Sequence, residues 1–416
     1  MARQRFLVRD LVLLSGAFFF IFLGPGAVQQ HLDKVLGDKR FYFLATLYLS
    51  FCIWRVFIGA TIRVLGDSLS ELLGAAVYVV AVAVLLVSTG WPTVLAAAAV
   101  WGWGAASLWI TSQAQLLDAS RRHGASSGFF YSALTAGQAL GVGLLALLAS
   151  RWPSLPSSLP LKDALLVTCA LLGLPGVALI ALVPRRRVER RGFSLGAFWG
   201  VARRGPIVLV GVILLLSSLS YGILLGVFSE ISRTAALGQW PAVAFYAARV
   251  ALCFPAGALA DRIGKERVLK LSFLLAAGGI LVAALWRTSP GLSLAICAAA
   301  MAVQSTLAQS NAMALMGDVA GSEERHMALG AVFFWRDLGV VIPLFVAGAL
   351  KGFVTGAGDI ETTFRGALFG FAAVFVASAF LCDALRRVVK QQPASLGERG
   401  KCQTPNAKSQ ATTKPR

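Results

Sequence analysis

The chain has 416 residues, of which 57% are apolar and only 14% are charged. An ordinary soluble domain is about 25% charged, so this composition excludes a soluble fold of this length, and its apolar content excludes a disordered chain. The net charge of +19 would suggest nucleic-acid binding in a soluble protein, but Lys and Arg gather in the cytoplasmic loops of membrane proteins. We therefore expect an all-α protein in a lipid bilayer, with no nucleic-acid partner.

Twelve apolar runs follow one another along the chain, and each is long enough for a membrane-spanning helix of about 20 residues. The first follows Arg3, Arg5 and Arg9 but has no small-x-small cleavage site, so we expect it to be retained as a helix and not removed as a signal peptide. The runs lie at residues 10–31, 42–62, 72–89, 93–117, 126–149, 163–183, 206–229, 240–260, 267–286, 291–317, 327–350 and 363–385.

The basic residues divide unequally between the two sides of the membrane. With the N-terminus inside, inner segments hold 26 Lys and Arg residues and outer segments hold 9, so both termini are predicted to be cytoplasmic. We expect an integral, multi-pass protein of the plasma membrane, which in a bacterium is the cell inner membrane. Its predicted parts are a six-helix half at 1–183, a basic linker at 184–205, a second six-helix half at 206–388 and a disordered basic tail at 389–416.

Residues in the two halves match at nearly constant offsets. Gly66 and Gly264 are 198 residues apart, and both follow the second helix of their half. Asp118 and Asp318 are 200 residues apart, and both close the fourth helix of their half. Parallel six-helix repeats are a transporter architecture in which the substrate site lies at mid-membrane between the repeats.

The stretch GALADRIGKER, residues 257–267, resembles the inner-loop signature of the major facilitator superfamily, glycine-x-x-x-aspartate-arginine-x-glycine-arginine or lysine. Asp318, followed by Glu323, Glu324, Arg325 and Gly330, is similar to that family's loop before the eleventh helix. The resemblance in topology covers about residues 8–388 and implies the family's fold, with twelve transmembrane helices in two six-helix pseudo-repeats.

This resemblance also implies roles for the signature residues. Asp261, with Arg262, Gly264 and Arg267 around it, would meet the positive end of a neighbouring helix and hold the inner side closed. A solvated loop charge is the alternative. In the first half Arg63 occupies the position of the aspartate, which puts the corresponding gating role in doubt there.

A second, weaker resemblance is to the branch of the family named after the "uncoordinated" potassium-channel regulator. Some members of that branch act on partner proteins, so a non-transporting regulator or chaperone stays open as a function. The resemblance is carried by Gly104-Ala-Ala-Ser-Leu-Trp109 with Gln113 or Gln115, by Gly128-Phe-Phe, and by Phe22-Leu-Gly24 with Gln29-Gln30.

Four charged residues lie deep inside the apolar runs, away from the run ends, namely Arg55, Arg249, Arg336 and Asp337, and such residues mark function by default in a membrane. In the family the second helix packs against the eleventh, so an ion pair between Arg55 and Asp337 would join the halves; the alternative is that Arg55 snorkels to the inner surface. We assign this pair, Arg336, Asp118 and Asp318 to conformational gating. Asp337 is interpreted as the carboxylate that lies well inside the bilayer.

Arg249 lies 12 residues from Asp261, which places it about 18 Å deep, near mid-membrane. Its planar guanidinium can bind a carboxylate, phosphate or sulfonate through two hydrogen bonds. The alternative is a structural pairing with backbone carbonyls or an unidentified acid. We predict that Arg249 faces the cavity and binds an anionic group of the solute.

Polar residues on the fourth and tenth helices are further cavity candidates, because in the family the first, fourth, seventh and tenth helices line the cavity. The alternative is that they are hydrogen-bond links between helices. Tyr131, Gln138, Tyr221, Tyr246 and Trp335 are interpreted as packing residues. The candidates are Trp103, Ser107, Thr111 and Gln115 on one face of the fourth helix, and Gln304, Ser305, Gln309 and Asn311 on the tenth.

The leading hypothesis is a secondary transporter that moves a small organic solute by alternating access, driven by a coupling proton or other ion. We expect a monomer, no enzyme activity, no cofactor and no metal site, since no Walker loop, catalytic triad or metal-ligand spacing is present. His31 with Asp33 is interpreted as a solvated turn at the outer mouth.

Overall fold

The computed structural model describes residues 2–119, 123–154, 158–184, 193–235, 237–263, 265–321, 323–353 and 357–391. Every regular element in these ranges is helical. The predicted tail lies outside the described residues, apart from the end of the last helix.

The first half of the chain forms a bundle of six membrane spans. Its elements are α1 (Ala2–Leu23), α2 (Pro25–Val28), η1 (Gln29–His31), α3 (Leu32–Leu36), α4 (Lys39–Val87), α5 (Trp91–Ala119), α6 (His123–Arg151), η2 (Trp152–Ser154) and α7 (Leu161–Ala181).

The second half repeats this arrangement after a short linker helix, α8 (Leu195–Ala202). Its elements are α9 (Gly205–Ile223), η3 (Leu224–Phe228), α10 (Ser229–Thr234), α11 (Trp240–Ile263), α12 (Lys265–Leu285), α13 (Pro290–Val319), α14 (Arg325–Phe353) and α15 (Ala357–Gln391).

Ten of these helical stretches are long and apolar enough to cross a membrane within the described residues. One of them, α4, contains two spans, because Gly66 adopts φ 76° and ψ 163° and breaks the helix between the predicted second and third runs. The shorter apolar stretch Trp240–Cys253 in α11 supplies the remaining span. The twelve predicted spans are therefore confirmed.

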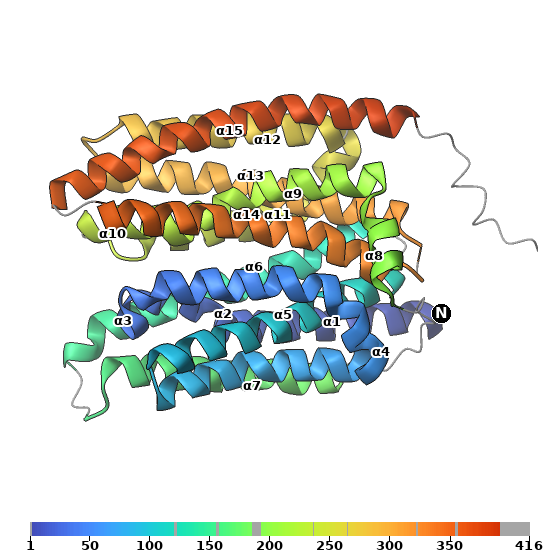
Figure 1. Ribbon diagram of the computed structural model, residues 1–416, viewed down its shortest axis with the longest axis horizontal. Helices are drawn as coiled ribbons and strands as arrows, with labels where there is room; N and C mark the ends of the chain where they lie inside the picture. The colour runs from blue at the N-terminus through green and yellow to red at the C-terminus, as the bar shows by residue number, and fades with distance from the viewer. Residues whose placement is uncertain are drawn as a thin grey trace, which may run out of the picture.

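Two spans are irregular in ways that the apolar pattern does not indicate. The first span breaks after Leu23 into α2, η1 and α3, and the seventh passes through the π-helix η3 before α10. Such π-bulges often occur at functional sites. The last helices of these two segments, α3 and α10, lie at the end of the bundle opposite α8 (Figure 1). We call these the α10 end and the α8 end.

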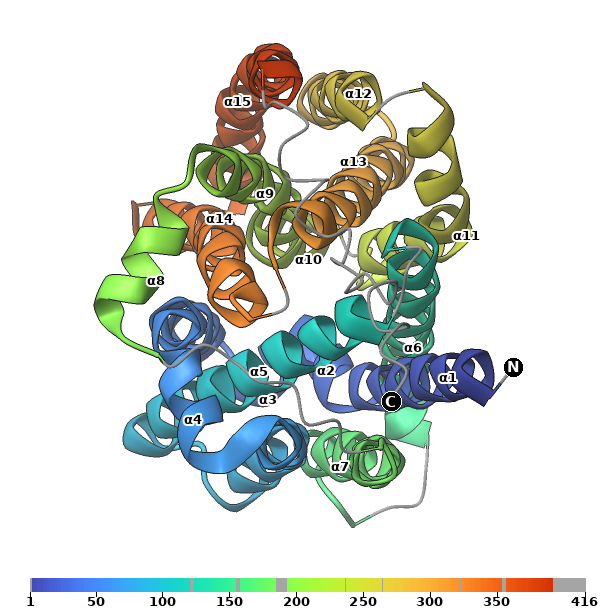
Figure 2. The ribbon, with the colours of Figure 1, turned by 90° about the vertical axis from the view of Figure 1, so that its right-hand side faces the viewer.

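The two six-helix bundles lie side by side, with α8 alongside both (Figures 1 and 2). Across the boundary α4 packs against α14, and α6 packs against α11 and α13. The predicted repeat is visible in the packing itself. A Cβ atom added to Gly137 of α6 would lie 2.1 Å from the Phe19 carbonyl of α1, and one added to Gly339 of α14 would lie 2.1 Å from the Leu215 carbonyl of α9.

Candidate functional site

A cavity of about 90 Å³ lies between the two halves. Ligand sites for drug-sized molecules usually measure about 300–1,000 Å³, so in this conformation the cavity admits only a small solute. The cavity is lined by Phe22, Gln29, Tyr48, Phe51, Tyr78, Trp109, Tyr131, Leu134, Gln138, Leu214, Ser217, Ser218, Tyr221, Arg249, Ser305, Gln309, Arg336, Asp337 and Val340.

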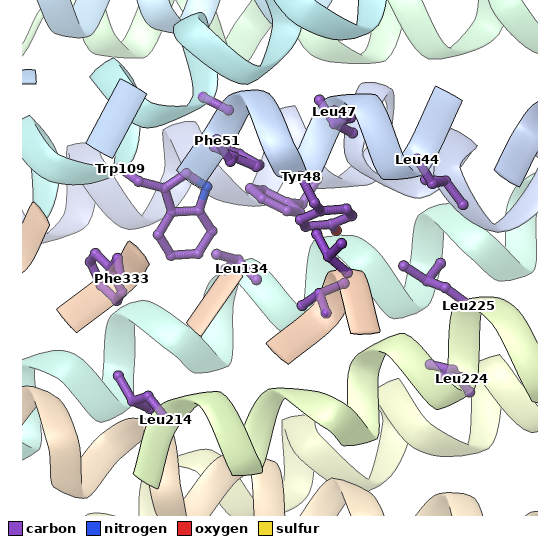
Figure 3. Packing of buried hydrophobic residues seen from close by; sticks show 14 of the residues in the cluster. Leu44, Leu47, Tyr48, Phe51, Trp109, Leu134, Leu214, Leu224, Leu225 and Phe333 are labelled. Atoms are coloured by element: carbon purple, nitrogen blue, oxygen red, sulfur yellow. The ribbon is translucent and has the colours of Figure 1, made fainter. Parts of the chain in front are cut away.

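Aromatic side chains form the wall of the cavity on the side of the first half. Tyr48, Phe51 and Trp109 stand together there, facing Leu214 from the second half (Figure 3). The indole Nε1 of Trp109 donates a hydrogen bond of 3.2 Å to the Tyr78 hydroxyl, so the ring has a fixed orientation. This wall supplies apolar contact and ring faces suited to a cation or a flat organic group.

Asp337 lies between two guanidinium groups at the boundary of the halves. Arg55 Nε of α4 donates to Asp337 Oδ2 at 2.9 Å, and Arg336 donates from Nε and Nη2 to Oδ1 at 2.8 and 2.7 Å. Arg55 and Asp337 are wholly buried. The predicted Arg55–Asp337 ion pair is present, and the snorkelling alternative is wrong because the Arg55 side chain is 0% exposed.

Aromatic rings hold the same two arginines in place. The Arg55 guanidinium lies 4.8 Å from the Phe333 ring centroid and 5.1 Å from that of Phe51. Arg336 lies 4.4 Å from Phe333 and 4.9 Å from Trp109. The terminal nitrogens of Arg55 have no hydrogen-bond partner in the described part of the chain, so ring faces surround this charge on its open side.

Arg249 reaches the cavity from α11. Its Nη2 donates a 2.7 Å hydrogen bond to Gln309 Oε1 of α13, and its guanidinium lies 5.6 Å from the Phe245 ring. The residue is 6% exposed, and its Nε has no hydrogen-bond partner among the described residues. Gln309 is a neutral acceptor, so its amide orients the guanidinium without cancelling the charge.

The charges in and beside the cavity are not balanced. Arg249, Arg336 and Arg55 carry three positive charges, and Asp337 carries one negative charge. Unpaired charge at mid-membrane is costly, at least about 2.5–3.5 kcal/mol on insertion scales. This group of side chains can therefore attract an anion and offer it hydrogen-bond donors.

At the α10 end a second cluster of charges joins the halves. Arg40 of α4 and Arg233 both pair with Glu230, and the Arg233 Nη2 to Glu230 Oε2 distance is 2.7 Å. Lys351, from the end of α14, pairs with Asp38 and lies 4.0 Å from Glu230. The hydrogen bond from Lys351 lowers the pKa of Asp38 below its ordinary value.

At the α8 end Asp118 of α5 pairs with Arg325 of α14, and both side chains are nearly buried. Nearby, Arg204 Nη2 lies 2.7 Å from Glu324 Oε2. A Cβ atom on Gly330 would lie 2.6 Å from the Arg55 carbonyl, so α4 and α14 touch backbone to backbone at this level. Contacts between the halves thus close both ends of the cavity.

The polar face predicted on the fourth helix does not line this cavity. Thr111 Oγ1 donates to the Ser107 carbonyl of its own helix at 2.7 Å, and Gln115 Nε2 donates to Glu71 Oε2 at 2.9 Å. Ser107, Thr111 and Gln115 are buried, and Trp103 is partly buried outside the cavity lining. These contacts match the alternative, hydrogen-bond links within and between helices.

On the tenth helix the structure separates the candidates. Ser305 and Gln309 line the cavity. Gln304 accepts a 2.8 Å hydrogen bond from Ser220 of α9, and Asn311 is buried away from the lining.

The residues of the inner-loop signature are mostly outside the described side chains. This holds for Asp261, Arg262 and Asp318, and Gly264 lies outside the described residues altogether. Arg267 is exposed near the start of α12. Their gating role therefore stays a prediction.

Sequence reasoning missed several polar residues. Glu71 is a buried carboxylate inside the third span, so Asp337 does not stand alone in the bilayer as predicted. It lies five residues after the break at Gly66 and just before the predicted third run, which begins at residue 72. Tyr131, Gln138 and Tyr221 line the cavity, although they were interpreted as packing residues.

The first helix and its mouth also differ from the prediction. His31 is wholly buried, with Nε2 lying 3.1 Å from the Val142 carbonyl, so the interpretation as a solvated turn is wrong. Gln29 and Trp109, which belong to the second resemblance, both line the cavity.

Comparison with known proteins agrees with this architecture. The sequence profile of the Major Facilitator Superfamily matches residues 210–411. The second half of the chain is therefore similar in sequence to this family. It is also 30% identical over 120 residues to UNC93-like protein 3 of Arabidopsis thaliana; the match covers 29% of this chain and spans only 26% of that relative.

Solved structures of superfamily transporters have the same fold. The fucose:proton symporter of E. coli superimposes with a TM-score of 0.67 at 14% identity, covering 91% of this chain and 99% of the symporter. The human organic anion transporter MFSD10 superimposes with a TM-score of 0.65 at 17% identity, covering 92% and 100%. The protein is thus a multi-pass membrane protein with a transporter fold and not an enzyme fold.

Proposed function

We propose that this protein is a secondary active transporter that moves a small organic anion by alternating access between its two halves. The observation that carries the proposal is the excess of positive charge in and beside the central cavity, where Arg249, Arg336 and Arg55 outnumber Asp337. An anionic solute that entered the cavity would reduce this imbalance and gain the planar donors of the arginines.

The packing of the halves supports a moving carrier. Ion pairs close the cavity at both ends, and breaking either set would open one side while the other stayed closed. The described part of the cavity lining holds no ring of charge or filter motif typical of a pore. The structure resembles that of a transporter named for organic anions, which agrees with the proposed solute class. At 17% identity this resemblance is evidence for the fold alone.

The orientation that we propose places the α8 end in the cytoplasm. The excess of Lys and Arg in the segments at that end supports it, because cytoplasmic loops carry such an excess. We assign the protein to the plasma membrane and expect it to act as a monomer.

For the gate at the α8 end we propose that Asp118 acts with Arg325, and that the signature residues Asp261, Arg262 and Arg267 act with them. Asp261→Asn would then reduce turnover while leaving the folded fraction near that of the parent. Unchanged turnover by this variant would show that the signature has no gating role here.

A ligand screen tests the function directly. Purified protein should gain thermal stability with small organic anions, such as mono- and dicarboxylates, phosphate esters and sulfonates, and not with neutral sugars of similar size. The best ligand, radiolabelled, should then exchange across proteoliposomes that contain the protein. Stabilisation by neutral or cationic compounds alone would contradict the anion assignment.

A second candidate function is a membrane regulator that kept the fold and lost transport. The observation that favours it is the match to an UNC93-like protein, together with Arg63 at the signature position of the first half. Counterflow separates the two functions. A regulator could bind a ligand, but it would not exchange labelled for unlabelled ligand across a bilayer.

A further inference from the structure

A second and larger cavity opens between the halves at the α10 end. It measures about 640 Å³, within the range of ordinary ligand sites, and we call it the vestibule. Its walls come from the broken end of the first span, the end of α6, α10 and the start of α11. Among its lining residues are His31, Asp33 and Lys34 of the first half and Ser232, Arg233 and Trp240 of the second.

A row of side chains on α11 leads from the vestibule to the central cavity. Trp240, Val243, Tyr246 and Arg249 follow one another at intervals of three residues, so each neighbours the next on the helix surface and the row winds around the helix. Trp240 and Val243 line the vestibule, and Arg249 lines the cavity. Tyr246, between them, is wholly buried. A solute that moved along this row from the vestibule to Arg249 would have to pass Tyr246.

Two neutral hydrogen bonds close the passage at this level, and each joins one half to the other. Gln30 Nε2 donates to the Tyr246 hydroxyl at 3.0 Å, and Gln138 Nε2 donates to the Tyr221 hydroxyl at 3.1 Å. The rings of Tyr221 and Tyr246 meet edge to face with centroids 6.4 Å apart. Neutral hydrogen bonds are weaker than those to charged groups, so this closure is easier to break than the ion pairs around Asp337.

A hydrogen-bond contact joins two elements of the vestibule wall, and the lining side chains carry more positive than negative charge. His31 Nε2 lies 3.1 Å from the Val142 carbonyl and so links η1 to α6. Lys34 is exposed, and the Arg233 side chain is half-exposed although it pairs with Glu230. Asp33 is the one carboxylate among the described lining residues, against these two cations.

We propose that the vestibule is a second binding site for the anionic solute, and that the hydrogen bonds Gln30–Tyr246 and Gln138–Tyr221 are the gate between this site and the central cavity. The identity of the solute as an anion rests on the proposed function. The solute binds first beside Lys34 and Arg233. It reaches Arg249 along α11 when the two tyrosines release their glutamines.

Cysteine reporters test the gate. The five cysteines of the described residues are buried, so a Cys402→Ser protein provides a quiet background. Val243→Cys reports on the vestibule and Ser305→Cys on the cavity. Each is treated with 2-sulfonatoethyl methanethiosulfonate in lipid nanodiscs, where both ends of the protein meet solvent and membrane orientation does not matter.

We expect Val243→Cys to react quickly and Ser305→Cys slowly in the otherwise unchanged protein. Adding Tyr221→Phe and Tyr246→Phe removes only the two hydroxyls that the glutamines bind. Ser305→Cys should then react about tenfold faster, because two net hydrogen bonds are lost, while Val243→Cys keeps its rate. Tyr42→Phe, the same change at an exposed tyrosine of α4, is the matched control and should alter neither rate.

Reagents of opposite charge test the binding site. Val243→Cys should react several-fold faster with the sulfonate than with 2-(trimethylammonium)ethyl methanethiosulfonate, after correction for their rates with a free thiol. Arg233→Gln and Lys34→Gln should each reduce this preference. Equal or reversed rates for the two reagents would overturn the vestibule site. A Ser305→Cys reaction rate that stays the same when Tyr221→Phe and Tyr246→Phe are added would overturn the gate. Neither assay needs transport, so both results stand apart from failure of the ligand screen.

Discussion

Two carboxylates, Asp337 and Glu230, each lie between two arginines at the boundary of the halves, yet their surroundings differ. The arginines of Asp337 are enclosed by aromatic rings, and none of the three residues is more than 9% exposed. Glu230 is equally buried, and its partner Arg40 is also nearly buried with a side-chain exposure of 8%, but its other two partners reach water, with side-chain exposure of 50% for Arg233 and 21% for Lys351. Separating the halves would leave the Asp337 charges in an apolar interior, whereas two of the three cations around Glu230 are already partly hydrated.

This difference suggests an order of events. Breaking a buried ion pair leaves an uncompensated charge, while breaking a pair at the surface costs little. The α10 end, with its partly hydrated cations and its vestibule, should therefore open before the contacts around Asp337 separate. In the proposed orientation the resting protein would open first to the outside.

The largest effect should follow from removing the central carboxylate. Asp337→Ala leaves two buried guanidiniums without a partner, so we expect a loss of about 3–5 kcal/mol in stability. Arg55→Ala should also be harmful, and the double variant should be milder than the sum of the two. Thermal unfolding in nanodiscs measures all three, and strictly additive losses would show that the pair makes no energetic contribution.

The second-largest effect should come from a substitution in the tight contact between α4 and α14, beside the charges around Asp337. A Cβ atom at Gly330 would lie 2.6 Å from the Arg55 carbonyl, so Gly330→Ala should cost about 1–3 kcal/mol through overpacking. Gly348→Ala, on the same helix towards the α10 end, meets nothing within 4 Å and is the matched control. Equal unfolding temperatures for the two variants would contradict the tight contact near Asp337.

Removing the charge of Glu230, the carboxylate at the α10 end, should have a smaller effect on stability. Glu230→Gln keeps the shape of the side chain, and two of the three cations that it releases, Arg233 and Lys351, are partly hydrated while Arg40 is nearly buried, so the loss should be smaller than that of Asp337→Ala. The same variant should make a cysteine at Ser305 more reactive, because the α10 end opens more often. Asp163→Asn, in a partly exposed pair with Lys162, serves as the control for loss of a charge near the surface. A stability loss as large as that of Asp337→Ala would contradict the proposed difference between the surroundings of Glu230 and those of Asp337.

The smallest effect concerns Asp38, whose carboxylate is mostly exposed. Lys351 lowers its pKa in the folded protein, so the pair stabilises the fold above the ordinary aspartate value of 3.8 and loses this contribution as the pH falls through the lowered value. Asp38→Asn should therefore lower the unfolding temperature slightly at neutral pH, and the difference should vanish in strong acid. A difference that grew as the pH fell would have the wrong sign.

The number and order of the membrane spans could be predicted from the sequence better than which face of each helix turns towards the cavity. The twelve spans and the Arg55–Asp337 pair could be predicted, because span length, depth along a helix and the packing of the second helix on the eleventh are enough to place them. The faces of α5 and α13 could not be predicted. A helix buried on nearly every side has no apolar stripe to show which face meets the cavity.

Particular residues show where this limit falls. Gln115 shares a helix face with Ser107 and Thr111 as predicted, but Gln115 contacts Glu71 and not the cavity. Arg249 could be placed because a charge at mid-membrane needs either a partner or a cavity. Tyr48 and Tyr221 could not, since a tyrosine in an apolar run looks the same whether it packs or lines a site.

The affinity of an anionic ligand for Arg249 variants tests the central claim most directly. With the anion found in the screen, Arg249→Lys should bind more weakly, since it keeps the charge but loses the planar fork, and Arg249→Gln should bind more weakly still. Both variants should fold, because the hydrogen-bond partner of Arg249 is the neutral side chain of Gln309, which a lysine or a glutamine at position 249 can also contact. Binding by Arg249→Gln as tight as that of the parent, at equal thermal stability, would contradict the account.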